Sequence, residues 1–309
     1  MRGRNFTQEV LNHCYQRTQD HGVLFYSDFD HLLLLTVFCT MAVRHKVQVL
    51  ALVQMPNHIH HGTVSRTRQQ LSAFVRDTMS IFCKEYNRAY NRTGPLMEKP
   101  FGSAPKRGNK AVKTNLIYQA NNPVERRLVL YAEEYRWNYL AYAVSDHPFS
   151  EKIILRHASM PLRRALKRIQ YLHEKGRYLS IPLLKNLFIG LRDTREREQL
   201  IDYIVSTYLI IDFDAVTRLF GGYNQALLAI HSTTGSEYDI HESFFGKSDV
   251  CYQQFARVLL EQGELEEIHQ IHTLPADEKL RLYRVLRRET EAPGRQIAAF
   301  LHLPVVGSY

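Results

Sequence analysis

Two histidines separated by one apolar residue, His58 and His60, form a pattern that could hold a divalent metal ion. An apolar, β-branched run precedes them, and Met55-Pro56-Asn57 is typical of a turn, so His58 should begin the second strand of a hairpin. Side chains alternate along a strand, which places both imidazoles on one face and Ile59 and His61 on the other. Two neutral imidazoles are a common half-site for a divalent cation. A His-apolar-His triplet alone is more often structural than metal-binding, so a metal site needs further candidate residues elsewhere in the chain.

A tyrosine and an asparagine about sixty residues later form that second group. A short helix is expected from Lys113 to the residue before Pro123, because proline cannot continue the hydrogen-bond ladder. Tyr118 and Asn122 are four residues apart and therefore share one helix face, whereas Asn121 should face away. The pattern predicts a phenol beside a neutral oxygen ligand.

The order of these motifs resembles the HUH single-tyrosine transposases, and more closely their REP-associated tyrosine transposase branch. The resemblance covers about the first 145 residues. The matching segments, in chain order, are Asn12-His13-Cys14-Tyr15-Gln16-Arg17-Thr18, Phe25-Tyr26, His58-Ile59-His60, Tyr86-Asn87-Arg88, Tyr118, Asn122-Pro123-Val124, Arg127-Leu128-Val129 and Tyr135-Arg136-Trp137-Asn138-Tyr139.

The resemblance implies a nuclease that cuts and rejoins single-stranded DNA, with Tyr118 as the nucleophile and a covalent 5′-phosphotyrosine intermediate. It implies a divalent metal ion held by His58 and His60, with Asn122 as the third ligand. Nitrogen ligands favour Mn²⁺ and abundance favours Mg²⁺. A hairpin-forming repeat is the substrate that the family suggests, and no nucleotide cofactor is needed.

The charge distribution agrees with a nucleic-acid partner. The chain has a formal net charge of +9 and a pI near 9.3. Residues 1–150 contain 19 Lys and Arg against 11 Asp and Glu, a net +8, whereas the remainder contains 21 against 20. Because phosphate neutralisation supplies most sequence-independent affinity, the half with the motifs has the charge that a DNA-handling domain needs, although net charge can also serve solubility alone.

A basic loop between Gly102 and Lys113 is expected directly before the tyrosine helix, either as a solvated linker or as a phosphate-binding segment. Aromatic residues could stack unpaired bases or pack in the core; they are Phe101, Tyr131, Tyr135 and Trp137. The candidate DNA-binding residues are Arg66, Arg68, Lys106, Arg107, Lys110, Lys113, Arg126 and Arg127.

Hydrophobic periodicity predicts an α+β fold for the first domain, residues 1–147. The expected elements are strand 8–17, helix 28–45, strands 47–54 and 58–65, helix 67–91, a short strand near 96–101 and the tyrosine helix 113–122. This βαββαβ order is the ferredoxin-like arrangement, in which two helices back an antiparallel sheet.

Residues 148–309 are expected to form a mostly helical accessory domain. Its predicted helices span 160–174, 180–190, 194–208, 212–219, 223–231, 248–262 and 276–290. Residues 292–301 resemble the first helix of a helix-turn-helix pair, but the rest of the 276–309 tail has almost no room for a recognition helix. Structural packing is therefore its expected role.

The composition favours a cytoplasmic protein. Four scattered cysteines without a Cys-x-x-Cys motif argue against a disulfide scaffold and a zinc ribbon. The longest apolar run, from Leu32 to Val43, is too short to span a bilayer, and no apolar signal core follows the first residues.

Two alternatives stay open. One is a catalytically silent, host-adapted nucleic-acid-binding regulator on the same scaffold, and the other is a relaxase or replication initiator with the same histidine clamp. The resemblance leaves the oligomeric state open between a monomer and a homodimer.

Overall fold

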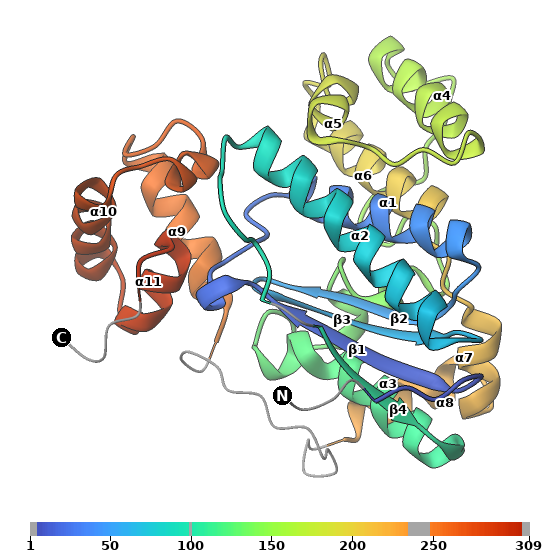
Figure 1. Ribbon diagram of the computed structural model, residues 1–309. Coiled ribbons are helices and arrows are strands. Elements are labelled where there is room, and N and C mark those ends of the chain that lie inside the picture. The colour runs from blue at the N-terminus through green and yellow to red at the C-terminus, as the bar shows by residue number, and fades with distance from the viewer. Residues whose placement is uncertain (1–4, 99–100, 234–247, 305–309) are drawn as a thin grey trace.

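A four-stranded antiparallel sheet forms the centre of the N-terminal part of the protein (Figure 1). The computed structural model describes residues 5–98, 101–233 and 248–304. The strands, in the spatial order β2-β3-β1-β4, are β1 (Leu11–Arg17), β2 (Gln48–Met55), β3 (His58–Val64) and β4 (Gly102–Lys106). With α1 (Asp28–His45) between β1 and β2, and α2 (Arg68–Ala89) between β3 and β4, the predicted βαββαβ order and the α+β class are confirmed.

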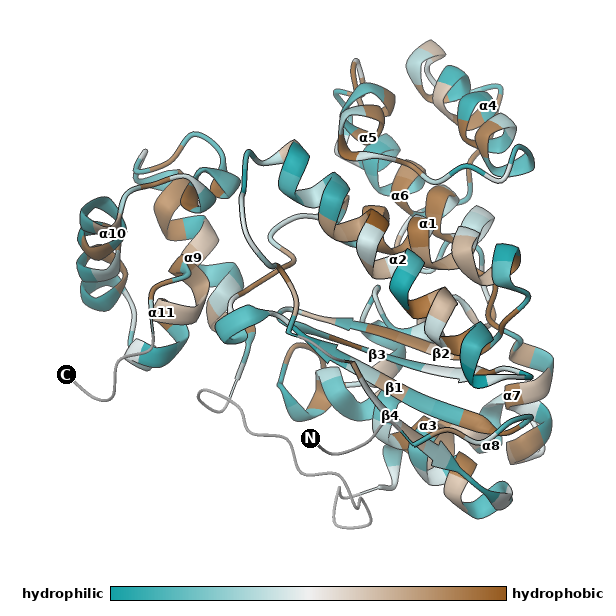
Figure 2. Cartoon of the chain, viewed as in Figure 1, coloured by the Kyte–Doolittle hydropathy of each residue, from teal (hydrophilic) through white to brown (hydrophobic). Residues whose placement is uncertain are grey.

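Helices α1 and α2 cover one face of the sheet, and α3 (Gly108–Glu125) covers the other (Figure 1). At the start of α1, the carboxylate of Asp30 accepts hydrogen bonds from the backbone N–H and the hydroxyl of the N-cap residue Ser27. Helix α2 turns an apolar stripe towards the core, in which Phe74 and Phe82 are fully buried. In Figure 2 this packing appears as brown residues along α1 and the strands, in contrast with the mostly teal α10.

The prediction for residues 96–113 was wrong in two respects. The short strand lies at Gly102–Lys106, where it pairs with β1, and not at 96–101. The basic segment is therefore this edge strand and the first turns of α3, which begins at Gly108, and it is not an open loop. Pro105 made this segment look unlike a strand in the sequence. An edge strand tolerates proline because the backbone groups on its outer side form no hydrogen bonds to a neighbouring strand.

The sequence predicted that the tyrosine helix ends before Pro123, and this prediction was wrong. The helix continues to Glu125, because the proline stands in the last turn and removes only one ladder hydrogen bond. The chain then leaves the helix through Arg127, whose φ is +56°. Arg127 N–H donates to the carbonyl of Val124, and Leu128 N–H donates to that of Pro123, which is a Schellman motif.

The helices after residue 150 belong to two hydrophobic cores. Five of them share the core of the sheet: α4 (Met160–Glu174), α5 (Ile181–Leu187), α6 (Thr194–Tyr208), α7 (Phe213–Phe220) and α8 (Tyr223–His231). Three others, with Val23, form a second core: α9 (Val250–Glu261), α10 (Ala276–Glu289) and α11 (Gly294–Leu301). The short 3-10 helices are η1 (Gln19–His21), η2 (Ala132–Glu134), η3 (Tyr139–Tyr142) and η4 (Ile268–His272).

Helix α11, in the C-terminal tail, packs into the second core. Ile297, Phe300 and Leu301 of α11 are buried in the second core, and the helix ends at His302 in a left-handed conformation. Residues 305–309 of the proposed tail lie outside the described residues. None of the four cysteines forms a disulfide, and no helix within the described ranges is long and apolar enough to cross a membrane.

Candidate functional site

His58 and His60, which we call the clamp histidines, lie on β3, an interior strand between β2 and β1. A two-residue turn, Pro56-Asn57, precedes β3, as the sequence predicted. The rings of His58 and His60 are perpendicular, with centroids 4.9 Å apart. The ring of His61 packs against Phe38 of α1, with the centroids 5.2 Å apart, so it points to the opposite face of the sheet. The alternation along β3 therefore presents His58 and His60 to α3.

Tyr118 projects from α3 onto this pair. Its ring meets that of His60 edge to face, with centroids 5.7 Å apart and an interplanar angle of 87°. The helix packs closely on the strand at Gly62, where an added Cβ would lie only 3.1 Å from Nε2 of Gln119. The glycine thus allows α3 to approach β3 closely enough for Tyr118 to reach the histidines.

Asn122 lies one turn after Tyr118, and its amide orientation is fixed by the helix itself. Its Nδ2 donates to the carbonyl of Tyr118 at 2.9 Å, which turns Oδ1 away from that carbonyl. Asn121 faces α8, where its Nδ2 donates to the carbonyl of Ile230 at 2.9 Å. The side chains of Asn121 and Asn122 therefore have different surroundings, as helix geometry predicts, and Asn122 lies on the same face of α3 as Tyr118.

His13 is a member of this cluster that sequence reasoning did not single out. Its Nε2 lies 3.0 Å from Nδ1 of His60, and its ring centroid lies 5.8 Å from that of Tyr118. The available signal was strand alternation: His13 is the third residue of β1 and faces the same way as Tyr15, which pairs with His60. The register that brings the two histidines together could not be deduced from β1 alone.

The donor atoms of this cluster fit a divalent cation. Nδ2 of Asn57 donates to the carbonyl of His21, so its Oδ1, 2.7 Å from Nδ1 of His58, accepts a hydrogen bond from that ring. This assigns the hydrogen of His58 to Nδ1 and the lone pair to Nε2. The same tautomer arises in His60 when its Nδ1 donates to His13. Outer partners of this kind orient metal-binding imidazoles.

A third ligand of another chemical type is required for such a cation. Within residues 5–98, 101–233 and 248–304, no group of three or more His, Cys, Asp or Glu side chains is arranged to hold a metal ion. Asn122, four residues after Tyr118 on α3, offers a neutral amide oxygen of the kind that such a cation accepts.

The site is closed to solvent in this conformation. His58, His60, Tyr118 and Asn122 each expose no more than 2% of their surface. Side chains from η3 hold α3 over the sheet: Nδ2 of Asn138 donates to the carbonyl of Ala120 at 2.8 Å, and the Tyr139 hydroxyl donates to that of Leu116 at 3.1 Å. The packing of α3 therefore keeps the two histidines out of contact with solvent.

Most of the predicted basic residues gather at one end of the sheet. Leu11 of β1 pairs with both Val64 and Lys106, so the residues that follow β3 and β4 lie at the same end of the sheet. The histidine pair is further along, since His60 precedes Val64 by four residues, about 13 Å along the strand. The members of this basic group are Arg66, Arg68, Lys106, Arg107, Lys110 and Lys113, all exposed or partly exposed.

Arg126 does not face solvent, contrary to the sequence-based expectation of a DNA contact. It is 4% exposed, and its guanidinium forms an ion pair of 2.6 Å with Asp249, which precedes α9. This buried ion pair links the start of α9 to the end of α3, so the Arg126 side chain is not available for DNA in this conformation. Arg127 is exposed, and its backbone terminates α3.

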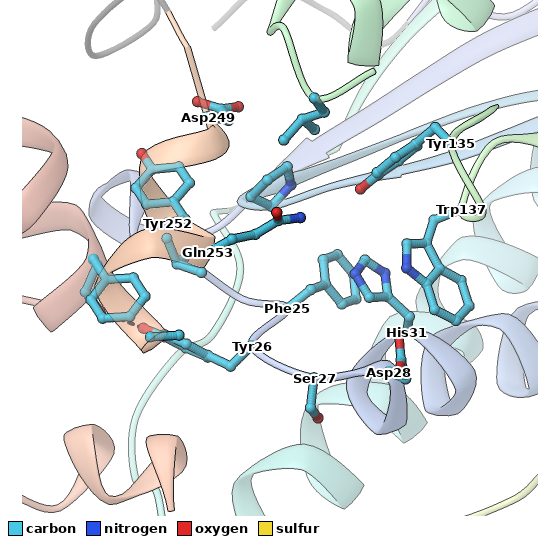
Figure 3. Close-up of a pocket in the computed structure, with 15 residues that line it drawn as sticks. Phe25, Tyr26, Ser27, Asp28, His31, Tyr135, Trp137, Asp249, Tyr252 and Gln253 are labelled. Carbon is cyan, nitrogen blue, oxygen red and sulfur yellow. Dashed lines mark hydrogen bonds between the residues drawn. The ribbon is translucent and has the colours of Figure 1, made fainter. Parts of the chain in front are cut away.

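The predicted base-stacking aromatics have different environments. Tyr131 is half-exposed, whereas Phe101 is buried. Tyr135 donates its hydroxyl hydrogen to the carbonyl of Gln54 at 2.8 Å, and with Trp137 it lines a cavity (Figure 3).

Comparison with solved structures finds a distant structural neighbour. No family model matches the chain, and no curated protein matches it significantly. The solved structure of a REP-associated tyrosine transposase bound to a REP hairpin superposes with a TM-score of 0.41 and 14% sequence identity. The alignment covers 47% of this chain and 84% of that one. This similarity is too distant to assign the chain to a family.

Proposed function

We propose that this protein is a metal-dependent DNA strand transferase that cuts and rejoins single-stranded DNA through Tyr118. The observation that carries the proposal is the ring contact between two elements. His60 of β3, beside His58, meets Tyr118 of α3, and Asn122 follows one turn further along the helix. A single-tyrosine transposase of the HUH type needs this combination of residues.

The reaction assigned to Tyr118 is an in-line displacement at a phosphodiester. The phenolic oxygen forms a bond to phosphorus, the bond from phosphorus to the 3′ oxygen breaks, and the phenolic proton is transferred to the departing 3′ oxygen. The products are a 5′-phosphotyrosine and a free 3′-hydroxyl. Because the number of phosphoester bonds is unchanged, the reverse reaction with another 3′ end rejoins a strand.

His58, His60 and Asn122 are the residues that would hold the cation. When bound, Mg²⁺ or Mn²⁺ supplies Lewis-acid polarisation of the phosphate, which a phenol with a reference pKa of about 10 requires at neutral pH. Asn57 and His13 orient the two rings.

The substrate we propose is a single strand next to a hairpin. The basic group at the end of the sheet offers phosphate contacts beyond Val64, which lies about 13 Å along β3 from His60, so a bound strand would run along the face of β3 towards the tyrosine. An unpaired strand is also flexible enough to enter beneath α3 once that helix has shifted.

A covalent-adduct assay tests this function. The protein is incubated with labelled single-stranded hairpin DNA and Mn²⁺, and the products are separated under denaturing conditions. We expect a denaturation-resistant adduct that is absent from Tyr118→Phe. The matched control is Tyr15→Phe, because Tyr15 pairs with His60 on β1 and is 43% exposed, so it is the phenol most easily mistaken for the nucleophile. An adduct that survives in Tyr118→Phe and vanishes in Tyr15→Phe would contradict the assignment.

Burial of the site favours a second candidate function, a non-catalytic nucleic-acid-binding regulator. Tyr118 exposes only 2% of its surface, which suits a protein that binds DNA through its basic group without cutting it. Hairpin binding without any adduct, with Mg²⁺ as well as Mn²⁺, would support this alternative.

A further inference from the structure

Positive charge is concentrated on the exposed face of α4, which lies on the side of α1 and α2 that faces away from the sheet (Figure 1). Residues 160–177 contain six Lys and Arg against one Glu, whereas the other residues of 151–309 contain 15 Lys and Arg against 19 Asp and Glu. The near-neutral balance of the C-terminal half therefore hides one strongly basic helix. The exposed residues of this face recur at helical spacing, and they are Arg164, Lys167, Arg168, Tyr171 and, just after the helix, Lys175.

The charges of α4 do not serve the stability of the helix. Its first turn contains no acidic residue, and Arg164 and Arg168 are like charges four residues apart. Like charges at this spacing destabilise a helix, and cations are unfavourable near its N-terminus. Helix α10 is basic too, but it has acidic residues in its first turn and Arg287 and Arg288 in its last. Helix stability thus gives a reason for the charges of α10 but not for those of α4.

The exposed cations of α4 are not neutralised by the protein itself. Among the described residues, no carboxylate forms an ion pair with Arg164, Lys167 or Arg168. Glu174, the acidic residue of this segment, accepts a hydrogen bond from Gln170 at 3.2 Å. The three cations are therefore available to a polyanion.

The opposite face of α4 is committed to the core. Leu162 and Ile169 are fully buried. At the start of the helix, the carboxylate of Glu196 accepts hydrogen bonds from the N–H and the hydroxyl of the N-cap residue Ser159. The helix is thus held in place and cannot insert apolar side chains into a lipid bilayer, as a membrane-surface helix does. A nucleic acid is the polyanion that this face suits.

A basic path leads from α4 to the basic group at the end of the sheet. The ends of α1 and α4 meet at a cavity of about 360 Å³, which Arg44 and Lys175 both line. Beyond Arg44, Nε2 of Gln70 donates to the carbonyl of Lys46 at 3.0 Å, and Oε1 of Gln70 accepts from the N–H of Arg66 at 2.7 Å. Because Arg66 belongs to the basic group of the sheet, the end of α1 joins the two surfaces.

We propose that α4 and the end of α1 bind the phosphate backbone of double-stranded DNA, next to the single strand at the candidate active site. Grooves for unpaired strands present successive aromatic side chains on which bases stack. The exposed face of α4 offers one phenol, Tyr171, and the guanidinium of Arg168 lies over its ring at 5.6 Å. Cations that contact phosphates position a duplex without reading its sequence. The inference rests on the proposed function for the identity of the duplex, which is the stem of the hairpin.

A series of hairpins tests the inference. Labelled hairpins with the same single-stranded tail and stems of increasing length are titrated by fluorescence anisotropy, in EDTA so that no strand is cut. We expect the affinity of the unmodified protein to rise with stem length until the duplex spans α4. The double variant Arg164→Gln and Arg168→Gln should lose most of this gain and bind the tail alone normally. For the longest stem, the slope of log affinity against log salt should become less steep by about 1.8, which corresponds to two phosphate contacts.

The matched control is the double variant Arg284→Gln and Arg288→Gln. It removes two exposed arginines at the same spacing on α10, and therefore the same net charge. It should leave the dependence on stem length and salt unchanged. Circular dichroism and thermal unfolding check that both variants fold. The α4 variant should be at least as stable as the unmodified protein, because a repulsive pair is removed.

Three results would overturn the inference. In the first, the α4 variant keeps the full gain with stem length, and in the second, the α10 control loses the gain equally. In the third, the α4 variant loses binding to vesicles of phosphatidylserine and phosphatidylcholine but keeps its binding to stems.

The outcome is independent of strand cleavage, because binding is measured without divalent metal ions. A stem-length dependence that requires Arg164 and Arg168, without any adduct at Tyr118, would leave the surface assigned and the transferase function rejected. An adduct at Tyr118, with an unchanged stem-length dependence in the α4 variant, would do the reverse.

Discussion

Nε2 of His13 lies 3.0 Å from Nδ1 of His60, and the two rings are stacked with centroids 5.2 Å apart. The contact joins β1 to β3 on the face covered by α3. It orients the imidazole that meets Tyr118, so the proposed metal site would depend on a residue that does not itself need to contact the ion.

Replacing His13 should lower the affinity of the site for the metal ion without abolishing adduct formation. In His13→Ala the ring of His60 loses its outer partner, and such losses typically reduce metal affinity or activity 10–100-fold. The adduct assay over a Mn²⁺ series should show a higher half-saturating concentration and partial recovery at high Mn²⁺. His13→Gln, which can still hydrogen-bond to His60, should be less affected. A Mn²⁺ dependence identical to that of the unmodified protein would contradict this role.

Replacing either clamp histidine should separate binding from chemistry. We expect His58→Ala and His60→Ala to lose adduct formation and to retain salt-dependent hairpin binding, because the basic group supplies the affinity. Filter binding at several salt concentrations measures the affinity. Normal cleavage by either variant would show that the clamp is misassigned.

Asp30 should make stability depend on pH. Burial opposes its ionisation, but His269, the Tyr90 hydroxyl and the Tyr26 N–H outweigh burial and hold the pKa of Asp30 below its usual value. A lowered folded-state pKa contributes stability above the unfolded value of about 3.9, which is lost as the pH falls through the lower folded value.

Asp30→Asn should therefore lower the free energy of unfolding at pH 7 by about 1.5–3 kcal/mol per hydrogen bond to the charge that is lost. The difference from the unmodified protein should shrink below about pH 4, and urea denaturation across a pH series measures it. A difference that stays constant down to the lowest pH would contradict the charged state of Asp30.

The ion pair of Arg126 and Asp249 should be strongly coupled. Both side chains are 5% exposed, so removing one partner leaves a buried charge. Arg126→Met or Asp249→Asn should each cost about 3–5 kcal/mol of folding free energy, and the double variant should cost less than the sum. Thermal unfolding of the four proteins completes the cycle. Strict additivity would show that the two charges are not coupled.

The sequence by itself determined the local chemistry of the site. Alternation along His58-Ile59-His60 decides which face each side chain occupies, and the four-residue spacing of Tyr118 and Asn122 decides that they share a helix face. Hydrophobic periodicity also predicted the βαββαβ order, because it reflects one-sided burial of each element. These properties depend on residues close together in the chain, so a single sequence contains them.

Only the tertiary structure decided what surrounds those residues. The register of β1 against β3 brings His13 to His60, the packing of α3 buries Tyr118, and a carboxylate more than 120 residues away takes Arg126 out of solvent. Strand pairing with β1 converted a proline-containing basic segment into β4. Register and packing arise from contacts between distant segments, whose energies depend on the whole fold, and no local spacing records them.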